Sequence, residues 1–376
     1  MKVIVAGDLA PISSRMCEQI DDEKFAEMFP NDLVSLIKDA DYSVVNFECP
    51  VANDNTTFIE KNGPVLKCSP KAVKAISYVG FRGVTLANNH VMDQGSEGLW
   101  RTIKSCEDCH LDVIGIGDNL NDASKIHYID IRGEKLAIIN CCEHEFSIAT
   151  DDAPGANPLD PIMQFYHIKE ARTKANYVVV IVHGGHEHFQ LPSLRMKQTY
   201  RFFIDAGADA VVNHHQHCFS GYEIYNNRPI FYGLGNFAFD WDGKRGSTWN
   251  KGYFVKIDFE SDVQFEIFPY EQYGESASVQ LIRSKDAFFS DLFKLNEIIN
   301  DDNELKRKTQ LFFESRKAIM KSILEPSQNR WIRFAIHRHL LPSMITRSWL
   351  IKMLNIINCE AHRDTLLYYL KSTTGE

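Results

Sequence analysis

No stretch of the 376-residue sequence approaches the roughly 20 consecutive apolar residues that a helix needs to cross a bilayer. We see no signal-peptide pattern either, because the first eight residues, MKVIVAGD, hold only a short apolar run before an acidic side chain. This opening is typical of a first β-strand. We therefore expect a cytoplasmic protein without a transmembrane segment.

The cysteines show neither a disulfide framework nor a zinc-finger spacing. There are nine, an odd number, and they are scattered along the chain, so reduced thiols are favoured. Cys106 and Cys109 have the spacing of half a zinc knuckle, but no second pair lies at a suitable distance. We interpret them as two cysteines at the end of a helix. Internal repeats and low-complexity segments are also missing from the sequence.

Charge is distributed unevenly along the chain. Residues 305–376 contain thirteen Lys and Arg against five Asp and Glu, whereas residues 1–304 contain 28 against 45. We weigh two interpretations equally: the basic segment docks on the acidic body, or it meets a polyanion or a membrane surface. Nucleic-acid binding is disfavoured, because the basic residues are interleaved with Leu, Ile and Trp as in a packed amphipathic helix.

Strands and helices alternate to about residue 220, and antiparallel hairpins follow. Apolar runs predict strands at 3–6, 42–47, 83–86, 113–116, 177–182 and 210–212. Helices are predicted at 22–29, 33–39, 70–79, 97–106, 161–174 and 194–206, and hairpins at 125–140, 222–232 and 252–270. This mixture indicates an α/β protein with two packed mixed sheets flanked by helices.

Only helical patterns remain beyond about residue 285. They predict helices at 287–299, 304–324, 330–340 and 349–370. We therefore divide the chain into a domain at residues 1–284 and a basic helical C-terminal region at residues 285–376.

Half of the fourteen histidines lie in three clusters that directly follow predicted strands. The clusters read ANNHVMD at 87–93, HGGHEH at 183–188 and NHHQH at 213–217. Imidazoles and carboxylates gathered at strand ends are how an α/β sheet builds a metal site. Since zinc-finger spacing is missing, a catalytic metal with an open position is favoured over a structural zinc.

Several of the polar residues at the predicted strand ends could serve either a functional or a purely structural role. Asp8 ends the first predicted strand, where it could bind a ligand or cap a helix. Asn46 and Glu48 alternate onto one face, so Glu48 could bridge two metal ions or form a salt bridge at the rim. Asn88 to Asp93 could be a polar turn; alternatively, an amide ligates metal while His90 acts as an acid oriented by Asp93.

The clusters at 183–188 and 213–217 favour a metal-binding role over a structural one more clearly. Two glycines between His183 and His186 let the backbone approach a ligand, and three imidazoles in six residues are hard to explain structurally. His215 and His217 occupy alternate positions of an extended segment and can aim at one point. The turn GLGNF at 233–237 lacks the lysine of a phosphate loop, and we expect it to place Asn236 at the rim of the site.

Taken together and in order, these segments resemble the CapA-type poly-γ-glutamate capsule-synthesis proteins. The resemblance covers roughly residues 1–260 and is carried by GD at 7–8, NFECP at 46–50, ANNH at 87–90, DQG at 93–95, HGGHE at 183–187, GADAVVNHHQH at 207–217 and LGNF at 234–237. That family is similar to the calcineurin-like metallophosphoesterases. The resemblance implies a four-layer α/β/β/α sandwich, with the helical C-terminal region as an extension.

The resemblance also implies a centre for one or two divalent metal ions. The implied metal ligands are Asp8, Glu48, Asn89, His183, His215 and His217. The catalytic candidates are His90, Asp93 and Glu187, with His90 protonating the leaving group. The substrate-binding candidates are Asn46 and Asn236. Manganese, iron and zinc all suit such a mixed nitrogen and oxygen ligand set.

Two positions depart from the wider superfamily. A histidine usually stands two positions after the first aspartate, and here that residue is Ala10. The second motif usually supplies a bridging aspartate, and here Glu48 takes its place. One metal is therefore a ligand short unless a further histidine supplies it; the candidates are His186, His188 and His214.

We therefore expect a capsule or poly-γ-glutamate biosynthesis protein with a metal-dependent hydrolase site of phosphoesterase type. The expected partners are an anionic polymer or a phosphorylated small molecule, together with other capsule-synthesis proteins. The alternative is a non-hydrolytic subunit of an exopolymer synthesis or export machine that binds polymer or a phosphorylated intermediate. Ala10 and the basic C-terminal segment favour this alternative.

Overall fold

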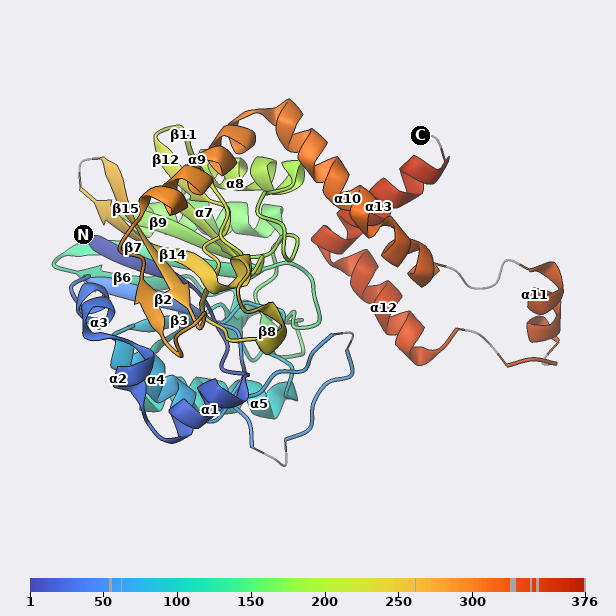
Figure 1. Cartoon of the computed structure of the whole chain (residues 1–376), viewed down its shortest axis with the longest axis horizontal. Coiled ribbons are helices and arrows are strands. Elements are labelled where there is room, and N and C mark those ends of the chain that lie inside the picture. The colour runs from blue at the N-terminus through green and yellow to red at the C-terminus, as the bar shows by residue number, and fades with distance from the viewer. Residues whose placement is uncertain are drawn as a thin grey trace.

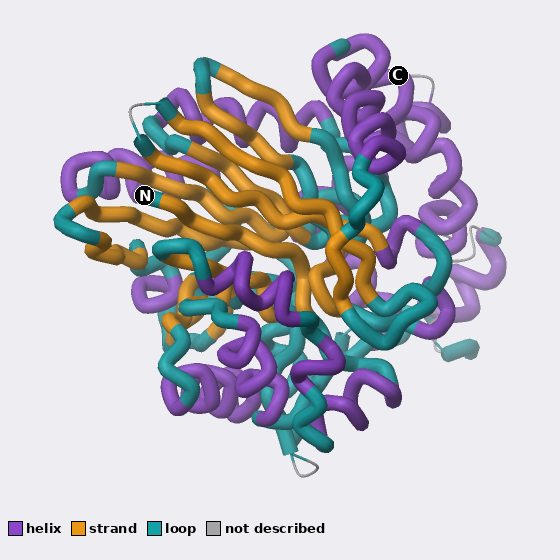
Figure 2. The backbone as a smooth tube through the Cα atoms, turned by 60° about the vertical axis from the view of Figure 1, so that its left-hand side comes forward, coloured by secondary structure: helices purple, strands orange, loops and turns teal. Residues whose placement is uncertain are grey.

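The computed structural model contains two β-sheets packed face to face, with helices on the outer side of each (Figures 1 and 2). It describes residues 1–53, 56–61, 63–260, 262–324, 329–338, 340–342 and 345–374, without the side chains of 318, 319, 321–324, 333, 336 and 337.

The first sheet has eight strands. They are β1 (Lys2–Leu9), β2 (Tyr42–Phe47), β3 (Gly83–Thr85), β4 (Asp112–Ile114), β13 (Asn236–Ala238), β14 (Lys251–Phe259), β15 (Val263–Gln272) and β16 (Val279–Leu281). Their order is β16-β15-β14-β1-β2-β3-β4, with β13 paired to the far end of β1. Strands β1 to β4 run parallel, so their carboxyl ends meet at one edge.

The second sheet has six strands in the order β11-β12-β10-β9-β7-β6. They are β6 (His127–Ile131), β7 (Glu134–Cys142), β9 (Tyr177–His183), β10 (Ala210–His214), β11 (Tyr222–Tyr225) and β12 (Arg228–Phe231). The parallel strands β7, β9 and β10 end beside the same edge of the first sheet. A separate two-stranded ribbon joins β5 (Ile116–Gly117) to β8 (Gly155–Ala156).

Helices cover both outer faces. The first sheet is covered by α1 (Ser14–Asp21), α2 (Phe25–Met28), α3 (Asn31–Lys38), α4 (Lys71–Val79) and α5 (Gly95–Asp108), and the second by α7 (Pro161–Lys174) and α8 (Leu194–Ala206). The short helix α6 (Leu120–Ala123) lies beside β5 and β8.

Alternating burial along the strands explains the four layers. In β2, Val44 packs between the sheets and Val45 packs under the helices of the first sheet. In β9, Val179 packs between the sheets and Val180 packs under α7 and α8. Because these strands are buried on both faces, their sequences are continuous apolar runs rather than alternating ones. The expected four-layer α/β/β/α arrangement is confirmed.

Several local predictions were wrong. Helix α1 was missed, although Ser13 caps it by accepting a hydrogen bond from the Met16 amide. The helix predicted at 22–29 is only the single turn α2. Strand β13 was expected to be part of a turn. The helix predicted at 349–370 is two helices, α12 (Arg347–Asn358) and α13 (Glu360–Thr374), because Cys359 has an extended backbone.

The C-terminal region consists of helices in two arrangements. Helix α9 (Asp286–Asn300) lies on the body, where Phe288 and Leu292 join the core between the sheets. The others are α10 (Asp302–Leu324), α11 (Arg330–His337), α12 and α13. Figure 1 shows α10, α12 and α13 beside one end of the body, with α11 set apart. The domain boundary at residue 284 stays a prediction.

Two sequence-based expectations concern the whole chain. All nine cysteines have free thiols, as predicted. Among the helices of the described residues, none is both long and apolar enough to cross a membrane.

Candidate metal centre

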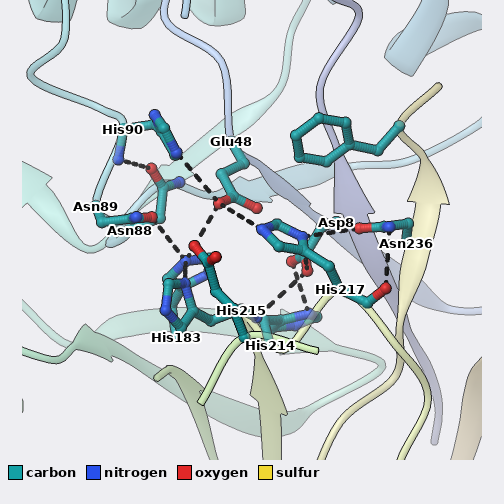
Figure 3. A network of polar contacts seen from close by, with 12 residues as sticks. Asp8, Glu48, Asn88, Asn89, His90, His183, His214, His215, His217 and Asn236 are labelled. Atoms are coloured by element: carbon teal, nitrogen blue, oxygen red, sulfur yellow. Dashed lines mark hydrogen bonds and ion pairs between the residues drawn. The ribbon is translucent and has the colours of Figure 1, made fainter. Parts of the chain in front are cut away.

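The carboxyl ends of strands from both sheets converge on one buried cluster of polar side chains (Figure 3). Asp8 comes from β1, Glu48 follows β2 and Asn89 follows β3. The histidines come from the end of β9, from the end of β10 and from the segment after β10. Gly7 makes this convergence possible, because a Cβ atom there would lie 1.9 Å from the carbonyl oxygen of Gly235. The neighbouring Asp8 amide donates to that same oxygen over 3.1 Å.

Glu48 occupies the centre of the cluster. Its Oε1 atom lies 3.5 Å from His183 Nε2 and 3.8 Å from His217 Nε2. Within the described part of the chain, neither carboxylate oxygen of this fully buried residue has a hydrogen-bond partner. Burial, followed by the nearby Asp8 carboxylate, raises the pKa of Glu48 well above its usual range. A buried carboxylate in this condition is costly unless a cation compensates it.

Two groups of possible metal ligands share Glu48. One consists of Asp8, Glu48 and His217, and the other of Glu48, His183 and His215; in each, the ligand atoms lie within 4.8 Å of one another. Donor atoms bound to one ion at about 2.0–2.2 Å are themselves about 3 Å apart or slightly more. His215 Nδ1 lies 3.0 Å from His183 Nε2, so the spacing suits a shared ion.

Asn89 completes the second group. Its Oδ1 atom lies 3.0 Å from His183 Nε2, the side of the ring that faces Glu48. The structure thus brings all six expected metal ligands into one cluster. The buried, unpartnered carboxylate and the mixed nitrogen and oxygen donors fit divalent metal ions.

His215 and His217 reach the cluster through an unusual backbone. Their φ angles are 89° and 55°, in the left-handed region that residues with a Cβ atom rarely occupy. Such a conformation costs on the order of 1–3 kcal/mol and is found mainly at functional sites. We had expected an extended segment with alternating side chains; the structure instead aims both rings by left-handed turns.

His214 lies beside Asp8, one of the expected metal ligands. Ala10 is buried and offers no ligand. His214 Nδ1 lies 3.4 Å from Asp8 Oδ1, and neither nitrogen of this buried ring has a hydrogen-bond partner among the described residues. His186 instead packs against Phe313, and the ring of His188 lies near Trp249. Of the three histidines considered, His214 is the one placed beside Asp8.

Asn46 and Asn236 lie behind the metal ligands rather than in an open pocket. Asn46 Nδ2 donates to Asp8 Oδ1 over 2.7 Å and lies 3.2 Å from His183 Nδ1. Asn236 Oδ1 lies 3.0 Å from His217 Nδ1, on the side of the ring away from Glu48. Both asparagines are buried, so their positions suit orienting the ligands more than contacting a substrate.

His90 belongs to a second polar network at the edge of the cluster. Its Nδ1 atom lies 2.7 Å from Asp93 Oδ2, and its Nε2 atom lies 3.9 Å from Glu48 Oε1. Lys61 was not predicted from the sequence. Its buried ammonium group forms an ion pair with Asp93 and lies 3.1 Å from His90 Nδ1. Burial and then the Lys61 charge lower the pKa of His90. Lys61 comes from a polar loop, which gave no signal of a buried role.

Glu187 reaches the cluster from the solvent side. Its carboxylate and the rings of His215 and His217 form a third group of possible ligand atoms within 4.8 Å. The residue is exposed. It is therefore the expected catalytic candidate with the most direct access to an incoming molecule.

Glu143 and Glu145, which follow β7, also lie near the cluster and were not predicted from the sequence. Asn89 Nδ2 donates to Glu145 Oε2 over 3.0 Å, and the Gly185 amide donates to Glu143 Oε2 over 3.1 Å. A usable signal existed, because these carboxylates follow a buried strand just as the recognised clusters do.

The sequence of this chain matches the family described as bacterial capsule synthesis protein PGA_cap over residues 2–241. The capsule biosynthesis protein CapA of Bacillus anthracis is 35% identical over 212 residues, covering 54% of this chain and 52% of the relative. The PGA biosynthesis protein CapA of Bacillus subtilis strain 168 is 33% identical over 247 residues, covering 64% of each. The chain thus spans about half to two thirds of the length of these relatives.

Solved structures are more distantly similar. A hypothetical protein from Thermus thermophilus gives a TM-score of 0.45 at 14% identity, covering 72% of this chain and 99% of the other. The calcineurin-like phosphoesterase YfkN of Bacillus subtilis gives a TM-score of 0.40 at 12% identity, covering 71% and 90%.

Proposed function

The chain belongs to the PGA_cap family of bacterial capsule synthesis proteins, and on that premise we propose that it is a divalent-metal-dependent hydrolase of phosphoesterase type. We place its activity in the synthesis of capsule or poly-γ-glutamate, as the names of its CapA relatives suggest. One observation about Glu48 carries the proposal. Its buried carboxylate has no hydrogen-bond partner in the described residues, and it belongs to two groups of possible metal ligands.

The metal ligands divide between two ions in this proposal. Asp8, Glu48, His214 and His217 would hold one, and Glu48, Asn89, His183 and His215 the other. The ions, manganese, iron or zinc, would polarise the scissile bond and activate water. Asn46 and Asn236 fix the orientation of Asp8 and His217, since the outer partner of a ligand sets its tautomer and position.

We assign the proton transfer in this proposal to His90. Asp93 holds its Nδ1 side, which leaves Nε2 directed toward Glu48 and the centre of the cluster. In its protonated imidazolium form, a ring held in this way can donate the Nε2 proton to a leaving group and become a neutral imidazole. Lys61 neutralises Asp93 and is a positioning residue in the same network.

The substrate class is anionic in this proposal: a phosphorylated small molecule or an acidic polymer such as poly-γ-glutamate. Capsule-synthesis proteins are the proposed partners, and a cytoplasmic location remains our expectation.

A second candidate function is a non-hydrolytic subunit of an exopolymer synthesis or export machine. Ala10 favours it, because the position that would supply a histidine ligand offers only a methyl group. Such a subunit would bind polymer or a phosphorylated intermediate at the same cluster without turning it over.

Metal analysis combined with a turnover assay tests both candidates. We expect the purified protein to bind one or two equivalents of Mn, Fe or Zn and to hydrolyse a chromogenic phosphodiester. His215→Ala should lose metal and activity, whereas His167→Ala on α7 should retain both. Binding of metal without turnover of any phosphoester would favour the second candidate. Absence of divalent metal from the wild-type protein would exclude the proposed hydrolase.

A further inference from the structure

A pocket separates the metal centre from the C-terminal helices. Its volume is about 210 Å³, and it lies between the segment after β9 and helices α10, α12 and α13. Glu187 lines it on the body side, and Phe312, Arg316, Lys352, Asn355 and His362 line it on the helical side. These helices lie beyond residue 241, where the match to the capsule-synthesis family ends.

The pocket adjoins the metal ligands through Glu187. The Glu187 carboxylate lies within 4.8 Å of ring nitrogens of His215 and His217, and the same side chain forms part of the pocket wall. A molecule seated in the pocket is therefore next to the proposed reaction centre, separated from it by one side chain.

Two cations on the helical wall, Arg316 and Lys352, form no ion pair with a carboxylate in the described part of the chain. Arg316 lies over the Phe312 ring, with its guanidinium carbon 5.1 Å from the ring centroid, and Phe312 in turn stacks on Phe189 at 4.4 Å. Both cations are half-buried. Their charges can therefore act on an anion that enters the pocket.

Acidic residues, by contrast, hold the helices in place. Glu360 accepts a hydrogen bond from the His144 amide over 3.0 Å, and its other oxygen lies 2.7 Å from His144 Nδ1. Asp364 pairs with Arg195 at 2.8 Å, and Arg195 also pairs with Glu143 at 2.7 Å. These contacts of α13 run opposite to the docking we considered from the sequence, whereas Arg347 of α12 pairs with Glu60 of the body in the sense we considered.

A third connection links α12 through Glu145 to the proposed metal ligand Asn89. Asn355 Nδ2 donates to Glu145 Oε1 over 3.1 Å, while Glu145 Oε2 accepts from Asn89 over 3.0 Å. Met320, Ile356 and Leu366 form a small apolar core that joins α10, α12 and α13. The helical wall is therefore fixed relative to the metal centre, which a binding site requires.

We propose that this pocket binds an oxyanion of the molecule acted on at the metal centre, with Arg316 and Lys352 as its binding residues. The oxyanion is a carboxylate or a phosphate, since both offer the acceptor oxygens that guanidinium and ammonium groups bind. The C-terminal region is in this view the specificity element of the protein. The assignment rests on the proposed function, because it takes the metal centre as the place of reaction.

The test uses the full-length, metal-loaded protein and two probes, inorganic phosphate and a short γ-linked glutamate oligomer. Binding is measured by calorimetry for the wild type, R316Q/K352Q and the charge-matched control K306Q/K371Q, whose lysines are exposed on α10 and α13. We expect R316Q/K352Q to bind at least one probe about tenfold more weakly, or worse, and the control to bind like the wild type. The probe affected identifies phosphate or carboxylate as the ligand group.

A conservative variant guards against a folding defect. Arg316→Lys keeps the charge but loses the planar fork of donors, so it should bind with intermediate affinity and melt like the wild type. Equal binding by the wild type and R316Q/K352Q, or no binding of either probe by the wild type, would overturn the assignment. Metal content separates the two proposals: a metal-free wild type contradicts the proposed function, whereas metal-loaded protein indifferent to R316Q/K352Q contradicts only the pocket.

Discussion

The side-chain amide of Asn89 has its oxygen toward the candidate metal cluster and its nitrogen toward Glu145. Asn89 Nδ2 donates a hydrogen bond to Glu145 Oε2 over 3.0 Å. The hydrogen bond fixes which end of the amide points at His183, because an amide in the opposite orientation would place its oxygen against a carboxylate. Glu145 also accepts a hydrogen bond from Asn355 of α12, so this carboxylate links the C-terminal helices to the candidate metal centre.

Glu48→Gln should abolish metal binding without destabilising the metal-free protein. Loss of even an outer-shell partner weakens metal affinity about 10–100-fold, so loss of a ligand shared by two groups should weaken it more. Because burial raises the pKa of Glu48, its charge is unfavourable in the folded state when no cation is bound, and glutamine removes that cost. Elemental analysis and thermal melts with and without chelator measure both effects. Glu97→Gln, at an exposed position of α5, is the control; full metal content in Glu48→Gln would contradict the shared-ligand arrangement.

His214→Ala should remove metal from the Asp8 side of the centre only. We expect up to one equivalent of metal to be lost, or its affinity to fall by about tenfold or more, while the group around His183 keeps its ion. Titration of the metal-free protein with Mn or Zn, followed by calorimetry, resolves the two sites. His110→Ala, a histidine outside the cluster, should titrate like the wild type. A His214→Ala protein with unchanged stoichiometry and affinity would show that this imidazole is not a ligand.

Lys61→Met and Asp93→Asn should each destabilise the fold more than the two changes together. Both side chains are almost fully buried and form an ion pair, so removal of one partner leaves an uncompensated charge. The expected loss for each single variant is about 3–5 kcal/mol in the free energy of unfolding. The double variant should recover part of it, and urea denaturation of the four proteins measures the coupling. Additive losses would mean that the pair contributes no coupling.

Docking of α13 should weaken as the pH rises through the pKa of His144. The contact with Glu360 raises that pKa above its ordinary value of 6.5, so the pair's contribution is complete below 6.5 and disappears above the raised value. The protection factor of amides in α13, which is the intrinsic exchange rate at a given pH divided by the observed rate, should therefore be higher at pH 6 than at pH 9. Glu360→Gln should remove this pH dependence while leaving exchange in β9 unchanged. Identical profiles for the two proteins would rule out His144 as its source.

The sequence by itself determined the layers and most of the cluster. Continuous apolar runs such as Tyr177–Val182 can only be strands buried on both faces, and polar residues directly after them must lie at the sheet edge. The family resemblance then gave a role to each of the six ligands, and the structure brings all six together.

Only the tertiary structure decided how that cluster is completed. Lys61 lies in a loop whose sequence carries no period, and its buried pairing with Asp93 depends on a contact 32 residues away. The end of helix α12 at Cys359 could not be predicted, because the helical sequence pattern continues through this residue. Contacts of Glu360 and Asp364 with the body override the helix propensity there.

The basic composition of the C-terminal region was visible from the sequence, but the use of its charges was not. Composition gives only the number of basic side chains. Which of them are paired with a carboxylate, and which can meet a ligand, depends on contacts between residues far apart in the sequence. Acidic residues hold α13 to the body, while Arg316 and Lys352 face the pocket beside the proposed metal ligands.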